Sequence, residues 1–125
     1  MKKINILILG TLLILSSITL NSCKHELDLS SAPTISFKND IQAIISGNCS
    51  MKACHGNDDR SEFPLTTYAN VMDEGGITPG NAKDSEFYKV LLINYGEKKM
   101  PPNGPLTDIQ IKKVFLWIEQ GAKDN

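Results

Sequence analysis

Two cysteines and a histidine lie within the seven residues from Cys49 to His55, in the stretch CSMKACHG. Thiol and imidazole groups this close together can hold a metal ion, form a disulfide, act as a catalytic pair or attach a cofactor. A closed zinc site needs four ligands, usually in two pairs, and the rest of the chain offers only Cys23 and His25, far upstream. A Cys49–Cys54 disulfide suits an exported chain but gives His55 no role. A catalytic pair lacks a neighbouring group that would orient the base.

The fourth interpretation is covalent attachment of haem. In the pattern C-x-x-C-H, the two thiols bond to the haem vinyl groups and the histidine that follows becomes an axial iron ligand. Here the spacing is C-x-x-x-x-C-H, so two extra residues must bulge outward between Cys49 and Cys54. His55 still directly follows Cys54, and the local geometry that the iron ligand requires is therefore retained.

A methionine followed by two prolines lies downstream of this motif, in KKMPP, where Met100 precedes Pro101 and Pro102. A first helix, the attachment motif, this Met-Pro-Pro loop and a final helix with Trp117 follow one another along residues 37–125. This order resembles the class I c-type cytochromes, and more closely the small haem domains of exported bacterial lipoproteins with lengthened attachment motifs.

The resemblance implies one covalently bound haem c. Cys49 and Cys54 are the expected thioether attachment points, and His55 and Met100 are the expected axial ligands of the iron. A haem with histidine on one side and methionine on the other is six-coordinate and is biased toward a high reduction potential. Such a centre is suited to carrying electrons.

Three further residues around the expected haem have more than one interpretation. Met72 lies on a short predicted helix and competes with Met100 as a ligand, although core packing also accounts for it. Met51 lies within the attachment loop, on the histidine side. In the family, a proline carbonyl after the attachment motif accepts a hydrogen bond from the iron-binding histidine, and Pro64 is the proline available for that contact or for a simple turn.

The N-terminus has the features of an export signal. Lys2 and Lys3 precede the apolar run INILILGTLLILSSITL, which turns polar toward its end and is shorter than the roughly 20 apolar residues of a membrane span. The sequence LNSC at 20–23 resembles the lipobox of bacterial lipoprotein signals, in which the cysteine is acylated. We therefore expect lipid on Cys23, with ordinary cleavage or a retained anchor as alternatives.

The chain is expected to divide into a lipoprotein signal peptide (1–22), a lipidated cysteine with a flexible tether (23–36) and a cytochrome c-like domain (37–125). Removal of the signal, which contains two lysines and no acid, leaves 11 basic and 14 acidic residues, a formal charge of -3. This balance gives no basic footprint for nucleic acid. A domain of about 90 residues is marginally stable unless a staple or a cofactor adds to its core.

The elements that position the motif are all predicted to be helices. Phe37, Ile41, Ile44 and Ile45 form one helical stripe that starts near Ser36 or Asn39, stops at Gly47 and leads to Cys49. A short helix is expected within 66–76, begun by Thr66 or Thr67 and ended by Gly75. Another is expected after Asp84 or Ser85, and a capping box, Thr107 with Gln110, opens a final helix that ends at Gly121.

No stretch alternates for long enough to predict a sheet. The fold class is therefore all-α, a small cytochrome c-like fold whose N- and C-terminal helices pack around the covalently bound haem. Five further apolar or aromatic side chains are expected in the core: Leu65, Tyr68, Tyr88, Leu91 and Trp117.

Together these features predict a monohaem c-type cytochrome that transfers electrons between redox protein partners in the cell envelope and is not itself an enzyme. It would be exported and anchored to a bacterial membrane through Cys23, facing the periplasm or the cell surface. Two alternatives remain at this point. One is a haem enzyme or gas sensor with an open sixth coordination site, and the other is a haem-free lipoprotein with a disulfide.

Overall fold

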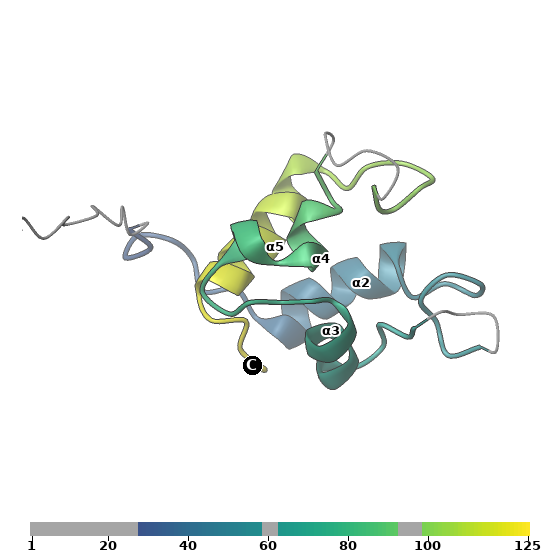
Figure 1. The fold of residues 1–125 in the computed structure, drawn as a ribbon. Helices are drawn as coiled ribbons and strands as arrows, with labels where there is room; N and C mark the ends of the chain where they lie inside the picture. Colours follow the sequence, from purple (N-terminus) through teal and green to yellow (C-terminus); the bar gives the residue numbers. More distant parts are fainter. Residues whose placement is uncertain (1–27, 59–62, 93–98) are drawn as a thin grey trace, which may run out of the picture.

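The computed structural model describes residues 28–58, 63–92 and 99–125, and these residues form helices joined by turns and loops (Figure 1). No strand occurs in these three ranges, so the predicted all-α class is confirmed. Within the same ranges, no helix combines the length and apolar character needed to cross a bilayer. The predicted signal peptide and Cys23 lie outside the described residues.

The first helix carries the chain to the attachment motif. A π-helical turn, η1 (Phe37–Ile41), continues directly into α2 (Gln42–Asn48), and Ser36 Oγ accepts a hydrogen bond from Asn39 N at 3.2 Å. All four residues of the predicted apolar stripe are buried. The helix passes through Gly47, where we expected it to end, because Cys49 N still donates to Ile45 O at 2.7 Å. Cys49 therefore lies at the C-cap of α2.

The middle of the chain forms three short helices. α3 (Tyr68–Glu74) begins after Thr67 and ends at Gly75, as predicted. A single 3-10 turn, η2 (Ala82–Asp84), precedes α4 (Glu86–Lys89), which is shorter than the apolar pattern indicated. Ser85 precedes α4, but its buried hydroxyl bonds to the preceding loop instead of capping the helix, accepting from Thr78 N at 2.9 Å and donating to Asn81 O at 2.8 Å.

The final helix, α5 (Asp108–Glu119), has the predicted capping box. Gln110 N donates to Thr107 Oγ1 at 3.3 Å, while Thr107 N donates to Gln110 Oε1 at 2.9 Å. Gly121 follows the helix with a positive φ of 97°, a conformation that favours glycine. The prediction for this helix is therefore confirmed at both ends.

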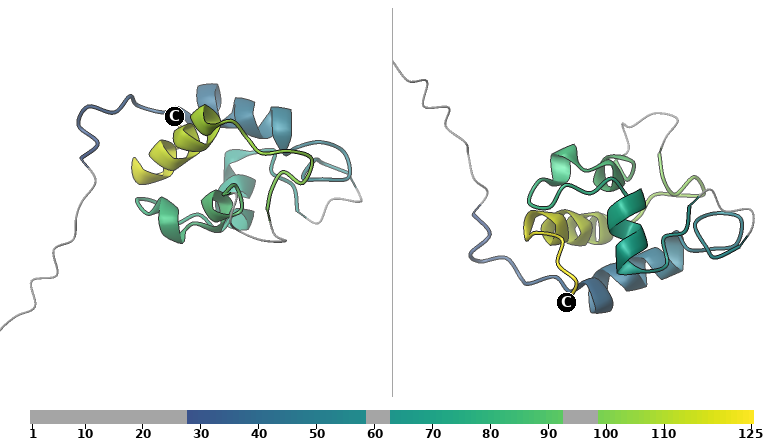
Figure 2. Two further views of the ribbon diagram at one scale, coloured as in Figure 1. Left: turned by 90° about the horizontal axis from the view of Figure 1, so that it is seen from above. Right: turned by 60° about the horizontal axis from the view of Figure 1, so that its bottom comes forward.

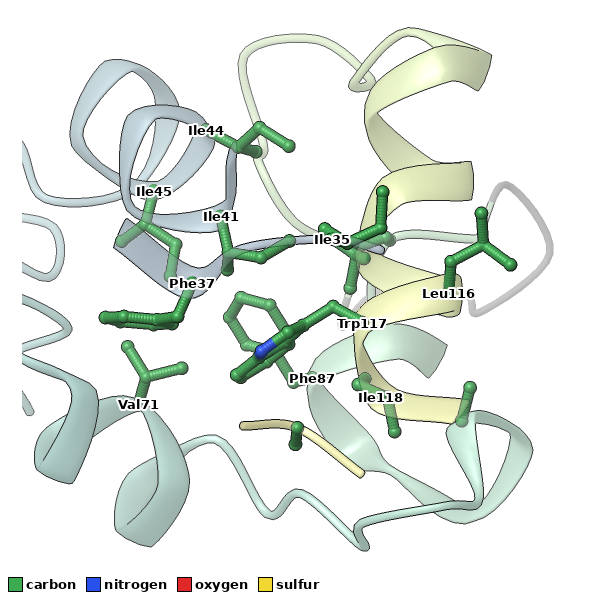
Figure 3. Close-up of a cluster of buried hydrophobic side chains, with 14 of the residues drawn as sticks. Ile35, Phe37, Ile41, Ile44, Ile45, Val71, Phe87, Leu116, Trp117 and Ile118 are labelled. Atoms are coloured by element: carbon green, nitrogen blue, oxygen red, sulfur yellow. The ribbon is translucent and has the colours of Figure 1, made fainter. Parts of the chain in front are cut away.

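Helices η1–α2 and α5 enclose the apolar core, with α3 and α4 against it (Figure 3). Trp117 is 1% exposed, and its ring centroid lies 5.5 Å from that of Phe37. The five predicted core residues are confirmed: Leu65, Leu91 and Trp117 are buried, and Tyr68 and Tyr88 pack partly buried against them. The core therefore packs the N-terminal helices of the domain, η1 and α2, against its C-terminal helix, α5.

The loops after Cys49 and after Met100 lie at the same end of the molecule, beyond the C-terminal end of α2 (Figure 2). The segment that leads in from the N-terminus lies at the opposite end in all three views. That segment was expected to be part of a tether ending at residue 36. Ile35, however, is 5% exposed within the core, and Leu29 and Ala32 pack against it, so contacts with the domain begin before Phe37.

Candidate functional site

The attachment loop is closed by its own backbone. After α2 ends, His55 N donates to Cys49 O at 3.1 Å, and both Cys54 N and Gly56 N donate to Met51 O at 3.1 Å. These bonds bring the first cysteine next to the Cys54–His55 pair although four residues separate the two thiols. The expected outward bulge is present, since residues 51–53 are exposed.

Two positions allow the longer loop to fold back on itself. Ala53 has a φ of +61°, and its N–H donates to Asp58 Oδ2 at 2.8 Å. Gly56 is buried, and a Cβ at this position would lie 3.0 Å from Met51 O and 3.2 Å from Ser50 O. Both atoms are backbone carbonyl oxygens of the inserted turn, so any side chain at this position would require the turn to shift by a few tenths of an ångström.

The imidazole of His55 is held from one side. Its Nδ1 lies 3.1 Å from Phe63 O, and because a carbonyl can only accept, Nδ1 carries the proton, which in a neutral imidazole leaves the lone pair on Nε2. The Phe63 ring also lies against the imidazole, with the ring centroids 4.5 Å apart. Pro64 was considered either as the source of this carbonyl or as a simple turn residue, and the carbonyl comes from the preceding residue, Phe63. His55 is thus arranged to offer Nε2 to a metal.

Met100 lies opposite this loop, on the segment that returns from α4. Its N–H donates to Val90 O at 2.7 Å, which ties the methionine to the end of α4. The side chain is 38% exposed, which is high for a methionine in a small domain. This exposure leaves the thioether accessible instead of buried in the core.

A cavity of about 400 Å³ lies between the two loops. Cys49, Cys54 and His55 line it, and so does Met100, so the structure brings together all four of the residues predicted to attach or ligate a haem. The remaining lining residues are Asn48, Met51, Ala53, Pro101, Pro102 and Asn103. The volume lies within the roughly 300–1,000 Å³ range of ligand sites.

The other methionines have separate environments. Met72 packs partly buried against the core and does not line the cavity, in keeping with a packing role. Met51 lines the cavity even though it belongs to the outward bulge, and it is 45% exposed. Pro64 is not among the lining residues. Among the described methionines, the cavity is therefore bordered by Met51 and Met100.

The two thiols are free and do not form a disulfide. Burial, with a smaller contribution from the neighbouring Cys54, raises the pKa of the Cys49 thiol to about 11. Burial thus makes Cys49 a poor nucleophile at neutral pH, because the thiolate is the reactive form. Within the described ranges, no group of three or more His, Cys, Asp or Glu side chains is arranged to hold a metal ion. The zinc and catalytic interpretations thus gain no support.

The donor groups of this cavity fit haem c. Two thiols stand beside an imidazole whose Nε2 is available, and a thioether borders the same space. Cys49 and Cys54 would hold such a group covalently, and His55 and Met100 would ligate its iron. The sequence alone did not indicate Phe63, because its carbonyl is placed by the path of the chain after the motif and not by a motif of its own.

Residues 52–104 match a family model described as Planctomycete cytochrome C (PSCyt1). The matched stretch is less than half of the chain and contains Cys54, His55 and Met100. Cys49, and with it the lengthened spacing, lies outside the match. No curated protein and no solved structure matches the chain. The family match supports a c-type cytochrome in general, a class that implies covalently bound haem c.

Proposed function

We propose that this chain is a monohaem electron carrier of the cell envelope. The observation that carries the proposal is the single cavity lined by Cys49, Cys54, His55 and Met100. A soft thioether and an imidazole bordering one space form the ligand pair that favours ferrous iron and a high potential. A haem ligated by both His55 and Met100 would supply one-electron exchange and would have no vacant site for a substrate.

The residues around the cavity have different roles in the proposed function. Cys49 and Cys54 fix the cofactor to the loop, so that it cannot dissociate. Phe63 keeps the proton on Nδ1 of His55, which makes Nε2 the ligand atom. Met100 would supply the second ligand to the iron, and the two prolines that follow it provide no backbone N–H beside the cavity.

The cellular setting is part of the proposal. The signal-like residues 1–22 and the lipobox-like LNSC support export and a lipid anchor at Cys23. Formation of thioethers on an exported chain agrees with that setting. The natural partners would be redox proteins that dock briefly, since electron-transfer encounters typically use small interfaces.

Production of the full chain together with a cytochrome c maturation system tests the haem. A pyridine haemochrome spectrum should show haem attached through two thioethers, at one haem per chain. Replacing either Cys49 or Cys54 by alanine should leave a single thioether and shift the spectrum accordingly. A colourless wild-type product would show that no haem is attached and would contradict the proposed electron carrier.

A ligand test separates an electron carrier from a haem enzyme or gas sensor. The reduced wild-type protein should bind carbon monoxide poorly, because Met100 occupies the sixth position. Met100→Ala should bind carbon monoxide readily and lower the reduction potential, whereas Met51→Ala, in the other methionine that lines the cavity, should resemble wild type. Rapid carbon monoxide binding by wild type, with no further change in Met100→Ala, would favour the open-site alternative.

A further inference from the structure

Residues 28–36, which we call the N-terminal strap, are fastened to the end of α5. Ile35 N donates to Gln120 Oε1 at 2.9 Å, and Gln120 Nε2 donates to Pro33 O at 2.8 Å. Leu29 and Ala32 add apolar contacts with the core. One glutamine side chain therefore bonds to the strap through both its oxygen and its nitrogen.

A second set of contacts fixes the point where the strap enters η1. Phe37 N donates to Asn125 Oδ1 at 2.8 Å, and Ser36 Oγ donates to Asn125 O at 2.6 Å. Lys38 N also donates to Asn125 O at 3.0 Å. Hydrogen bonds to Gln120 and Asn125 therefore fix the C-terminal half of the strap, and the apolar contacts of Leu29 and Ala32 hold its N-terminal half against the core.

These contacts shorten the chain that can separate a lipid on Cys23 from the domain. Only six residues lead from Cys23 to Leu29, and they span at most about 21 Å when fully extended. If contacts began only at Phe37, fourteen residues would span up to about 50 Å. The strap thus more than halves the reach of the domain from a membrane anchor.

The cavity lies at the far end of the molecule from the strap. Helices η1 and α2 run from Phe37, next to the strap, to Asn48, which lines the cavity. Their 12 residues cover about 18 Å at the α-helical rise. Both views in Figure 2 place the attachment loop and the Met100 loop at the end opposite the N-terminal segment. If the cavity end faced the membrane, the segment from Cys23 to Leu29, at most about 21 Å long, would have to extend along these 18 Å of helix. Almost none of its length would then remain to reach the lipid surface.

We infer that the anchored protein holds its cavity away from the lipid surface and exchanges electrons with a partner whose redox centre lies in the aqueous phase, not with a quinol in the bilayer. This inference rests on the proposed function, since it needs both the lipid on Cys23 and the haem between the two loops. The strap favours the aqueous partner because it shortens the free chain after Cys23. The shorter chain limits how far the domain can rotate to bring its cavity to the membrane.

The experiment uses the full lipidated holoprotein in vesicles with two reductants of the same chemistry. One is a long-chain menaquinol confined to the bilayer, and the other is menadiol, its water-soluble analogue. Three proteins are compared: wild type, a variant with about ten Gly/Ser residues inserted between residues 27 and 28 to add about 35 Å of reach, and Pro105→Cys coupled to a maleimide lipid. Pro105 is exposed on the loop that follows Met100 and does not line the cavity, so this second anchor draws the cavity end to the membrane.

Wild type should react with the bilayer menaquinol at least about tenfold more slowly than the other two proteins, because tether geometry sets the effective concentration. All three should react alike with menadiol. Equal rates with the bilayer menaquinol in all three would overturn the inference alone. Failure of the wild-type protein to float with vesicles would overturn the anchor in the proposed function, and the inference with it.

Discussion

At the scale of single residues, the lengthened attachment loop depends on Gly56. A side chain there would meet the carbonyl oxygens of Met51 and Ser50, neither of which can move without opening the loop. Gly56→Ala should lower the free energy of unfolding by about 1–3 kcal/mol, as expected for overpacking, and should reduce the yield of attached haem. Denaturant unfolding and haem absorbance per chain measure the two effects.

Gly47→Ala is the matched control for this prediction. Gly47 lies within α2, and no atom lies within 4 Å of an added Cβ. The substitution should stabilise the protein by up to about 1 kcal/mol through helix propensity. A Gly56→Ala protein as stable as wild type would contradict the loop described above.

The raised pKa of Cys49 predicts a pH dependence in the haem-free protein. The unfolded thiol ionises near its ordinary value of 9.0, while the folded thiol retains its proton to about pH 11 because burial disfavours the thiolate. The free energy of unfolding should therefore fall as pH rises from 9 to 11, by up to about 2 kcal/mol. Urea titrations across this range measure the fall. Cys49→Ala should remove this contribution, and an unchanged slope in that variant would assign the fall to another group.

Some of the candidate site could be predicted from the sequence because covalent adjacency determines it. His55 follows Cys54 in any fold, and Pro101 and Pro102 follow Met100. The contact between Phe63 and His55 could not be predicted, because it depends on the path of a loop with no regular structure. The position of Met51 beside the cavity could not be predicted for the same reason, because it depends on how the loop closes.

At the scale of elements, one ion pair joins the first and last helices. Lys113 Nζ donates to Asp40 Oδ1 at 2.7 Å, and Ser36 N donates to Asp40 Oδ2 at 3.1 Å. The lysine, and next the backbone N–H, hold the pKa of Asp40 below its ordinary value. The pair therefore stabilises the fold above about pH 4 and is lost as pH falls through the lowered pKa.

Lys113→Ala should accordingly cost about 0.5–1 kcal/mol at pH 7, the range for a partly exposed pair. Its difference from wild type should shrink below about pH 4, where the unfolded carboxyl is protonated. Thermal unfolding of wild type and Lys113→Ala at pH 7 and again below about pH 4 tests this expectation. Lys112→Ala changes a neighbouring exposed lysine on the same helix and should leave stability nearly unchanged at either pH.

Helix ends that are set by interactions between residues close in sequence were predicted correctly, whereas those set by contacts elsewhere in the fold were not. α3 and α5 begin at Thr67 and Thr107, whose hydroxyls accept from backbone N–H groups three residues later, and such caps can be read locally. Gly47 did not stop α2, because burial of Ile44 and Ile45 against the core outweighs the low helix propensity of a single glycine. Ser85 bonds to the loop that precedes it instead of to its own helix, and the cap pattern did not reveal this choice of partners.

At the scale of the whole molecule, the core and the cavity occupy different regions. The core is centred on η1, α2 and α5, whereas the cavity lies beyond the C-terminal end of α2. Apart from Cys49, which packs at the edge of the core, no residue that lines the cavity contributes to the core. The helices thus have an apolar centre that is largely separate from the cavity.

This separation predicts that the haem-free protein keeps its helical core. In Cys49→Ala/Cys54→Ala, which cannot form thioethers, the emission of Trp117 should stay blue-shifted and the far-UV dichroism should stay helical. Trp117 is the only tryptophan, its ring packs on Phe37, and its Nε1 donates to Lys123 O at 2.9 Å. Proteolysis should instead cut the two cavity loops, where the group that would order them is missing.

Phe37→Ala, introduced into the same haem-free background, is the control, because it removes the ring on which Trp117 packs. It should cost about 3–5 kcal/mol and shift the emission to the red. If the haem-free protein already has solvent-exposed tryptophan emission without this substitution, the core depends on the cofactor. The helices would then assemble around the haem, and the cavity could not be treated as a site built at the end of a self-sufficient core.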